Sequence, residues 1–251
     1  IAATALERAG IPFETVFSKQ LDESELESIA ATDHDTVLFT DFGSGQLDLI
    51  AGHEAAGAFT PVIADHHQPA DAATEYHLNP LLVGINGASE LSGAGASYVL
   101  ARALATTAQQ STDNRDLAAL AVVGAVGDMQ AGVDGLSGAN THIVDEGVEA
   151  GVIEESTDLT LYGKQTRPLP KLLEYASDAR IPGISNDAAG AIGFLSDLDL
   201  DLKTDGEWRC WVDLDDDERQ VVVSALVQRA VTSGVPASRV DDLVGTSYQL
   251  T

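Results

Sequence analysis

Short apolar runs that end at an aspartate mark the first third of the chain. Residues 37–40 form one such run before Asp41 and a glycine-rich turn at 43–45, and residues 61–64 form another before Asp65. Apolar runs of this length predict buried strands, and the stretch 46–56 between them predicts a crossover helix. This order of strand, helix and strand is typical of a parallel α/β sheet, whose site lies beyond the carboxyl ends of the strands.

Most of the remaining chain has helical periodicity. Helices are predicted over residues 1–8, 23–30, 95–107, 116–129, 140–150, 170–176, 187–195 and 213–232, and a strand is predicted over residues 13–17. The stretch 116–129 is almost wholly apolar, so we expect it to be buried. The predicted fold class is α/β: a parallel sheet flanked by helices, followed by a smaller and mostly helical part.

The character of the sequence changes near residue 180. We expect residues 1–180 to form a catalytic domain and residues 181–251 to form a smaller, insertion-like helical region. No internal repeat and no low-complexity linker separates the two.

The charge of the chain is strongly unbalanced. Its 40 acidic residues face 13 lysines and arginines, which gives a formal net charge of −27. Such a surface repels itself in dilute buffer, whereas salt at about 1 M shortens the Debye length to about 3 Å. We therefore expect a protein adapted to a salt-rich cytoplasm. An acidic disordered chain is the alternative, but the apolar residues are too many and too periodic for it.

Cysteine usage and hydropathy bear on the compartment. Cys210 is the only cysteine, so an internal disulfide is excluded and a reducing compartment is expected. No apolar run approaches the roughly 18 residues of a membrane span, and no signal peptide opens the chain. These features predict a cytoplasmic protein without a membrane partner.

Carboxylates within or at the end of apolar segments are the main chemical signal. Asp41 and Asp65 end the two predicted strands, His66 and His67 follow directly, and Asp128 lies in an apolar helix. A buried carboxylate is costly unless it is paired, hydrogen-bonded or bound to metal. Mixed aspartate and histidine ligation suits Mn²⁺, Fe²⁺ or Zn²⁺ better than Ca²⁺. Two cations about 3.5–4 Å apart can stabilise a phosphoryl displacement, which makes phosphoester hydrolysis the predicted reaction class.

Taken alone, the triplet Asp65-His66-His67 is weak evidence. It arises by chance in about one chain in a hundred of this composition, and an ordinary polar strand end would also contain it. Its combination with Asp41 and Asp128 makes the metal site the better interpretation.

With these residues together, the sequence resembles the DHH phosphoesterases. Asp41 is similar to the second motif of that family, the triplet at 65–67 to its third, name-giving motif, and Asp128 to its fourth. The resemblance covers most of the chain and is closest to archaeal RecJ-like single-strand exonucleases of the haloarchaeal type, which are relatives of a eukaryotic replisome scaffold. Further similar stretches are Asp41–Gln46, Asn79-Pro80, Ser92–Gly95 and Tyr162–Leu169.

The resemblance implies a role for each central residue. Asp41 would bridge two metal ions, and His66 and Asp128 would ligate one of them. Asp65 would orient a histidine and His67 would lie toward the scissile phosphate, so both are candidate catalytic residues. The implied cofactor is a pair of divalent cations, with Mn²⁺ first and Mg²⁺ or Co²⁺ as alternatives.

Five further residues are implied to bind the substrate: Asn79, Ser92, Gly93, Gly95 and Arg167. The first four would face it at a helix N-terminus, which is a natural anion site. A plain helix N-cap is an equally good role for Ser92, and a structural ion pair is an equal alternative for Arg167.

Two parts of the family pattern are not found in the sequence. Nothing before Asp41 fits the first motif, an Asp-x-Asp that supplies ligands to both metals, because the acidic tripeptide at 33–35 precedes the wrong strand. In relatives that motif comes before a helix like the one predicted over 1–8, so we expect it to be cut off upstream. The family's C-terminal substrate-binding domain is also expected to be missing. The chain as it stands is therefore expected to bind metal incompletely and to cut poorly.

The resemblance implies a metal-dependent exonuclease that acts on single-stranded DNA or RNA. Two alternatives stay open: a replication-complex scaffold that has lost catalysis, and a phosphodiesterase for short oligonucleotides or cyclic dinucleotides. A GINS-like replisome partner is a further implied candidate. The net charge opposes a polyanionic substrate unless salt and metal ions screen it, together with Lys164, Arg167 and Lys171.

Overall fold

A computed structural model describes residues 1–107, 113–176 and 180–251. These residues form two compact units, one of residues 1–155 with 248–251 and the other of residues 156–247. Within the described ranges, none of the helices combines the length and the apolar character that a membrane crossing requires.

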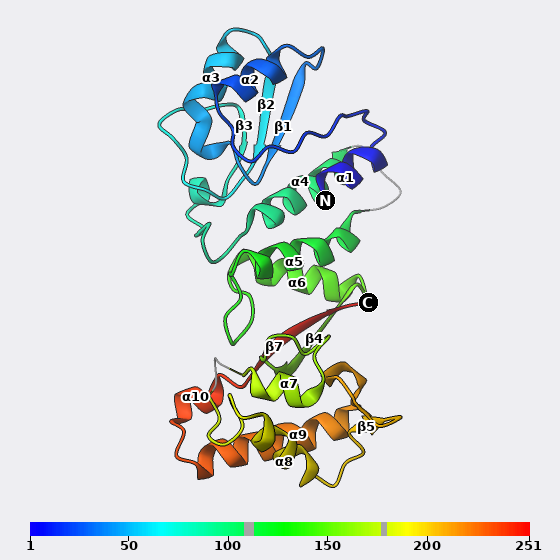
Figure 1. Cartoon of the computed structure of the whole chain (residues 1–251). Helices are drawn as coiled ribbons and strands as arrows, with labels where there is room; N and C mark the ends of the chain where they lie inside the picture. Colours follow the sequence, from blue (N-terminus) through cyan, green and yellow to red (C-terminus); the bar gives the residue numbers. More distant parts are fainter. Residues whose placement is uncertain (108–112, 177–179) are drawn as a thin grey trace. The chain divides into compact units, whose positions relative to one another are not determined.

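The first unit contains a three-stranded parallel sheet in the order β1-β2-β3 (Figure 1). β1 (Thr36–Thr40) pairs with β2 (Thr60–Ala64), and β2 pairs with β3 (Tyr76–Leu78). A short 3-10 turn, η1 (Ser44–Gln46), leads into α3 (Leu47–Ala55), which connects β1 to β2 as the predicted crossover helix. The predicted α/β fold class with a parallel sheet is confirmed.

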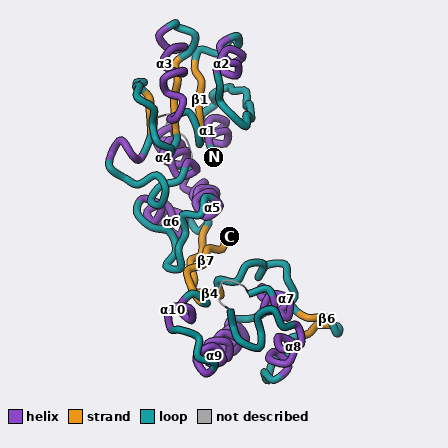
Figure 2. The backbone as a smooth tube through the Cα atoms, turned by 60° about the vertical axis from the view of Figure 1, so that its left-hand side comes forward, coloured by secondary structure: helices purple, strands orange, loops and turns teal. Residues whose placement is uncertain are grey.

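One face of the sheet is covered by α3 and by α2 (Glu23–Ala30), as Figures 1 and 2 show. Phe39 of β1 and Ile63 of β2 are partners in register, so they point to the same face. They pack with Leu26 of α2 and Ile50 of α3 in one buried cluster. Burial of each of these side chains contributes about 1.5–3 kcal/mol, which fixes the sheet against its helices.

Four helices make up the rest of the first unit. They are α1 (Ala2–Arg8), α4 (Gly93–Thr107), α5 (Ala118–Gly127) and α6 (Ala139–Glu149). α4 packs against α1 and α5, and α5 packs against α6, around buried side chains that include Tyr98. Two 3-10 turns, η2 (Pro80–Val83) and η3 (Arg115–Leu117), lie in the connections.

Two sequence predictions for this unit are wrong. The apolar helix predicted over 116–129 is not buried all round, because it packs through one face only and leaves Leu120, Val123 and Val126 exposed. The strand predicted over 13–17 does not form. Val16 and Phe17 face solvent, with Phe17 93 % exposed, and no described strand pairs with the segment.

The second unit is mostly helical, as predicted. Its elements are α7 (Leu169–Glu174), α8 (Ala188–Ser196), β5 (Lys203–Thr204), β6 (Glu207–Trp208), η4 (Trp211–Asp213), α9 (Asp216–Thr232) and α10 (Ala237–Asp241). β4 (Ile153–Leu159) and β7 (Val244–Leu250) form a two-stranded sheet along which the chain enters and leaves this unit. α9 begins later than predicted, because Asp215 is extended and caps the helix by accepting from Glu218 N.

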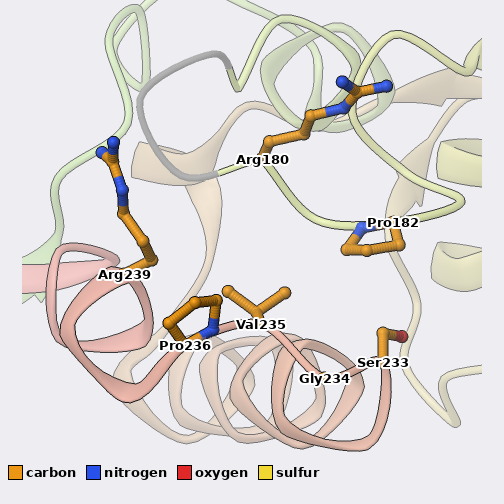
Figure 3. A pocket seen from close by; sticks show the side chains of 7 residues that line it. All are labelled: Arg180, Pro182, Ser233, Gly234, Val235, Pro236 and Arg239. Atoms are coloured by element: carbon orange, nitrogen blue, oxygen red, sulfur yellow. The ribbon is translucent and has the colours of Figure 1, made fainter.

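A hollow of about 630 Å³ opens on the second unit (Figure 3). Its lining combines apolar and cationic side chains: Arg180, Pro182, Ser233, Gly234, Val235, Pro236 and Arg239. Arg180 and Arg239 stand on two sides of it. Among the residues that the structure describes, its lining contains no carboxylate or histidine.

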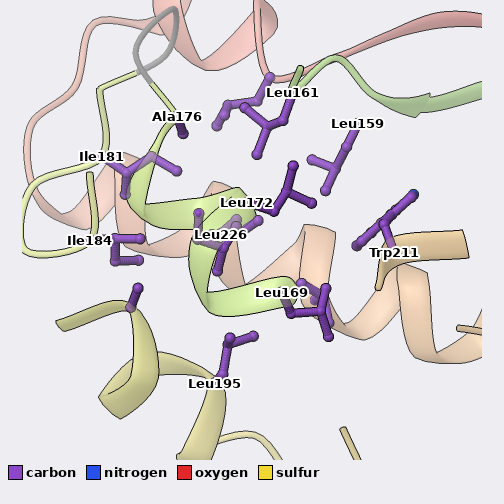
Figure 4. Close-up of a cluster of buried hydrophobic side chains, with 14 of the residues drawn as sticks. Leu159, Leu161, Leu169, Leu172, Ala176, Ile181, Ile184, Leu195, Trp211 and Leu226 are labelled. Atoms are coloured by element: carbon purple, nitrogen blue, oxygen red, sulfur yellow. The ribbon is translucent and has the colours of Figure 1, made fainter. Parts of the chain in front are cut away.

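The core of the second unit extends across the predicted domain boundary. Leu172 of α7, Leu195 of α8 and Leu226 of α9 meet in one buried cluster with Trp211 (Figure 4). Because α7 packs against α8, residue 180 lies inside this unit. Along the sequence, the chain passes from the first unit to the second near residue 155 instead.

Candidate metal centre

The two aspartates at the strand ends lie at the same edge of the sheet. Asp41 N donates to Ala64 O at 2.9 Å, and Asp65 N donates to Leu78 O at 3.1 Å. The ladder therefore continues one residue past each strand. Asp41 adopts a left-handed φ of 64°, which aspartate tolerates better than most residues. Its side chain stays 66 % exposed.

Asp65 is fully buried and is held by hydrogen bonds on both carboxylate oxygens. Oδ2 accepts from Ser44 N at 2.9 Å, and Oδ1 accepts from His66 N at 2.8 Å and from His67 Nδ1 at 2.7 Å. Burial alone would raise the pKa of Asp65, but the hydrogen bonds from His67, Ser44 and His66 outweigh it and lower the pKa. The carboxylate is thus kept ionised without contact with water.

His66 is nearly buried and is oriented by the backbone. Its Nδ1 donates to Gly87 O at 2.6 Å, which leaves Nε2 pointing toward Asp41, with 3.4 Å between Nε2 and Oδ1. Asp128 approaches from the other side, with Oδ2 3.5 Å from Nδ1. The ring therefore lies between two carboxylates and presents one nitrogen to the more exposed of them.

These neighbours favour the protonated form of His66. The hydrogen bond to Asp41 raises its pKa to about 9 against the effect of burial, and the Gly87 carbonyl and the charge of Asp128 act in the same direction. A ligating imidazole must be neutral, so a cation bound here takes the place of that proton.

His67 is the exposed member of the pair. Its side chain is 57 % exposed, and its Nδ1 lies 2.7 Å from Asp65 Oδ1. Because that nitrogen donates to the carboxylate, Nε2 is the atom left to face solvent or a ligand. The His66 and His67 rings touch edge to face, with centroids 4.3 Å apart.

A layer of polar residues lies behind the triplet, and the sequence predicted Asn79 as a substrate residue but neither Ser44 nor His77 as site residues. Asn79 Nδ2 donates to Ser44 Oγ at 2.8 Å and to His67 O at 2.9 Å, while its Oδ1 accepts from Leu81 N. His77 Nε2 lies 2.9 Å from Ser44 Oγ, and burial lowers the pKa of His77. Ser44 belongs to the glycine-rich turn after β1, which is the signal that could have identified it.

A second supporting chain positions Asp128. Gln130 Nε2 donates to Asp128 Oδ2 and to Gly87 O, both at 2.9 Å. Asn140 Nδ2 donates to Gln130 Oε1 at 2.7 Å, and Asn140 Oδ1 accepts from Ser92 N at 3.4 Å. The starts of α4 and α6 are therefore tied to the carboxylate through Gln130 and Asn140, which no motif indicated.

The N-terminus of α4 approaches Asp41 closely. A Cβ on Gly93 would lie 1.9 Å from Asp41 Oδ1, so only glycine fits there. Ser92 is buried and its Oγ accepts from Gly95 N at 3.0 Å, which makes it an N-cap. A hollow of about 260 Å³ lies at this point, lined by Asp41, Ser92, Gly93, Ala94, Gly124, Gly127 and Asp128.

The donor set fits a divalent cation. One ligand atom each from Asp41, Asp65, His66 and His67 lies within 4.8 Å of the others. Asp128 lies outside this group of four, but it lines the same hollow as Asp41. Carboxylate oxygens together with imidazole nitrogen are suited to Mn²⁺, Fe²⁺ or Zn²⁺.

The predicted substrate residues occupy different places. Asn79 and Ser92 are buried and bonded to protein atoms, and Gly95 packs under Leu91, where a Cβ would lie 2.6 Å from its Cδ1. Gly93 borders the hollow. Arg167 belongs to the second unit.

Part of the chain matches a known protein family. Residues 161–244 match the DHH-CID domain. The match agrees with the predicted resemblance to DHH proteins, and it covers most of the second unit. The metal centre lies outside the DHH-CID segment.

The chain is also similar to larger proteins. It is 28 % identical over 235 residues to an uncharacterized protein from Methanocaldococcus jannaschii, a match that covers 90 % of this chain and 49 % of that protein. The chain thus spans about half the length of this relative.

Two solved structures are similar to most of the chain. One is RecJ in complex with Mn²⁺ from Thermus thermophilus, with 18 % identity, a TM-score of 0.45, and coverage of 92 % of this chain and 33 % of that chain. The other is exonuclease RecJ bound to manganese, with 19 % identity, a TM-score of 0.45, and coverage of 92 % and 58 %.

Proposed function

We propose that this chain is a metal-dependent phosphoesterase of the RecJ-like type, which hydrolyses phosphodiester bonds in single-stranded nucleic acid. The observation that carries the proposal is the convergence of Asp41, Asp65, His66 and His67 at one sheet edge. A buried, ionised carboxylate that anchors two histidines beside an exposed carboxylate is an arrangement that a divalent cation completes.

Asp41, His66 and Asp128 are the residues that would hold the cations, for which we propose two Mn²⁺, with Mg²⁺ or Co²⁺ as substitutes. The bond from His66 Nδ1 to Gly87 O leaves Nε2 as the ligating nitrogen. When bound, the cations would neutralise charge on the phosphate and make water a better nucleophile.

His67 would act on the substrate. Asp65 accepts from its Nδ1, which fixes the ring and leaves Nε2 free to face the substrate. His67 Nε2 would then donate a hydrogen bond or a proton to an oxygen of the scissile phosphate. Asn79 supports this role by holding the His67 carbonyl from behind.

The hollow between Asp41 and Asp128 would receive the phosphate. Its volume of about 260 Å³ is below the 300–1,000 Å³ of pockets that enclose small molecules. A phosphate of a strand lying across the surface suits it better than an enclosed small substrate. The first backbone N–H groups of α4, at Gly93, would face the anion.

The test is release of nucleotides from an end-labelled single strand by the protein in high salt, with Mn²⁺ and with EDTA. We expect hydrolysis only with metal, and a loss of at least about 100-fold in Asp41→Asn and Asp128→Asn, as for removal of a ligand or its support. Asp48→Asn on the exposed face of α3 is the matched control and should keep full activity.

The same assay separates the proposal from a scaffold that has lost catalysis. Metal-dependent hydrolysis that disappears in Asp41→Asn and persists in Asp48→Asn supports the nuclease. Hydrolysis that is equal in all three proteins would come from a contaminant and would refute the assignment of the metal centre.

A further inference from the structure

The conspicuous motif Tyr162–Leu169 takes no part in the metal centre. It forms the loop between β4 and α7 in the second unit. Lys164 anchors the loop, since its Nζ donates to Asp158 Oδ2 at 2.7 Å, to Leu159 O at 3.0 Å and to Ser247 Oγ at 2.9 Å. Lys164 therefore has a structural role, and its three hydrogen bonds fix the position of the loop.

Arg167 lies between two tyrosine rings. Its guanidinium carbon is 5.1 Å from the centroid of Tyr162 and 5.2 Å from that of Tyr175, and Nη1 donates to Tyr162 O at 3.1 Å. Lys171 continues the row, with Nζ 5.3 Å from the Tyr175 centroid. We call Tyr162, Arg167, Tyr175 and Lys171 the tyrosine platform.

The backbone is shaped to hold Arg167 in this place. Gly163 has a φ of +94°, and a Cβ there would lie 2.7 Å from Arg167 Cδ and 2.8 Å from Nε. Any other residue would strain the loop and displace the guanidinium. The stacked arrangement is therefore built into the loop and is not a chance contact of a long side chain.

Both rings of the platform face solvent. Tyr162 is 80 % exposed and Tyr175 is 53 % exposed. The contacts found for the Arg167 guanidinium in the described ranges are with rings and a carbonyl rather than a carboxylate, although the chain has 40 acidic residues. Exposed aromatic rings beside an arginine are features on which bases stack and phosphates pair, whereas Lys171 Nζ is already paired with Glu174 Oε2 at 2.7 Å.

We propose that the tyrosine platform binds single-stranded nucleic acid, with bases stacked on Tyr162 and Tyr175 and the backbone drawn to Arg167 and Lys171. This proposal rests on the proposed function for the choice of ligand. Stacking suits a chain of net charge −27, because salt weakens phosphate contacts but leaves base stacking in place.

The test is the affinity of the full chain for a labelled single-stranded oligonucleotide, measured by fluorescence anisotropy in EDTA so that no hydrolysis occurs. We expect Tyr162→Ala and Tyr175→Ala each to weaken binding about 5- to 150-fold, the effect of losing one stacked base. Tyr162→Phe should bind like the parent, because the ring is kept. Gly163→Ala should weaken binding through displaced Arg167.

Tyr76→Ala is the matched control, since this tyrosine is 50 % exposed in the first unit. Unchanged affinity in Tyr162→Ala and Tyr175→Ala would overturn the platform. A loss of affinity in Tyr162→Phe or Tyr76→Ala as large as in those two variants would also overturn it. Because binding is measured without metal, the two proposals can fail separately. A protein that binds through the tyrosines but never hydrolyses the strand refutes the nuclease alone. A protein that hydrolyses the strand, and whose affinity is unchanged in Tyr162→Ala and Tyr175→Ala, refutes the platform alone.

Discussion

Replacement of Asp65 by asparagine tests whether this carboxylate holds the metal centre together. Oδ1 accepts from His66 N, His67 N and His67 Nδ1, whereas Oδ2 accepts from Ser44 N. The amide of asparagine would keep its oxygen at the three-donor side. Its NH₂ would then face the buried Ser44 N–H, which leaves two donors opposed.

The expected loss follows from these contacts. A buried donor without a partner costs about 1–3 kcal/mol, and charged hydrogen bonds of about 1.5–3 kcal/mol become neutral bonds of about 0.5–1.5 kcal/mol. Burial of a neutral amide in place of a charge offsets part of this. We therefore expect the free energy of unfolding to fall by about 2–4 kcal/mol in Asp65→Asn.

The assay is urea unfolding in EDTA, followed by far-ultraviolet circular dichroism. Asp41→Asn is the matched control. The Asp41 side chain is 66 % exposed, so replacing its carboxylate should lower the free energy of unfolding by less than about 1 kcal/mol. The same substitution should abolish the stabilisation of the protein by added Mn²⁺. A stability of Asp65→Asn within about 0.5 kcal/mol of the parent would refute the reasoning, as would an equal loss in both variants.

Three further predictions address other parts of the chain. Gly93→Ala should weaken Mn²⁺ binding at least about 10-fold in calorimetry, because its methyl group would displace Asp41; unchanged affinity would contradict the close approach. Leu172→Ala should destabilise the second unit by about 2–5 kcal/mol in urea, and a cost below about 1 kcal/mol would argue against the buried cluster. The hydrogen bond from Arg8 lowers the pKa of Asp116 below its value of about 3.9 in the unfolded chain. The ion pair therefore adds less than about 1 kcal/mol to the free energy of unfolding above that pH, and this contribution is lost as the pH falls through the lower pKa of the folded state. Asp116→Asn should lose this pH dependence when the unfolding of the variant and the parent is measured side by side at several pH values. A parent whose stability shows no such dependence would contradict the ion pair between Arg8 and Asp116.

The sequence by itself determined the local elements near the site. Apolar runs that end at Asp41 and Asp65 predict two buried strands, and the stretch 46–56 between them predicts a crossover helix, because run length and turn residues are local properties. Both strands and the helix between them are present. The same local rules misjudged residues 13–17, since a strand also needs a partner, and that partner is a tertiary feature.

Only the tertiary structure decided which residues support these carboxylates. Ser44, Gln130 and Asn140 come from three separate segments and follow no periodic pattern, yet they hold Asp65 and Asp128 through directed hydrogen bonds. Hydrogen-bond partners of a buried charge are chosen by distance in space, which a sequence does not record.

The extent of burial and the use of Arg167 were likewise decided by the fold. The apolar composition of α5 predicted burial, but a helix is covered only where neighbouring helices reach it, and Val123 stays exposed. Arg167 was predicted to bind substrate or form an ion pair; its stacking between Tyr162 and Tyr175 depends on how α7 folds back beside the loop. Composition sets what a side chain can do, and the neighbours that the fold supplies set which of those interactions form.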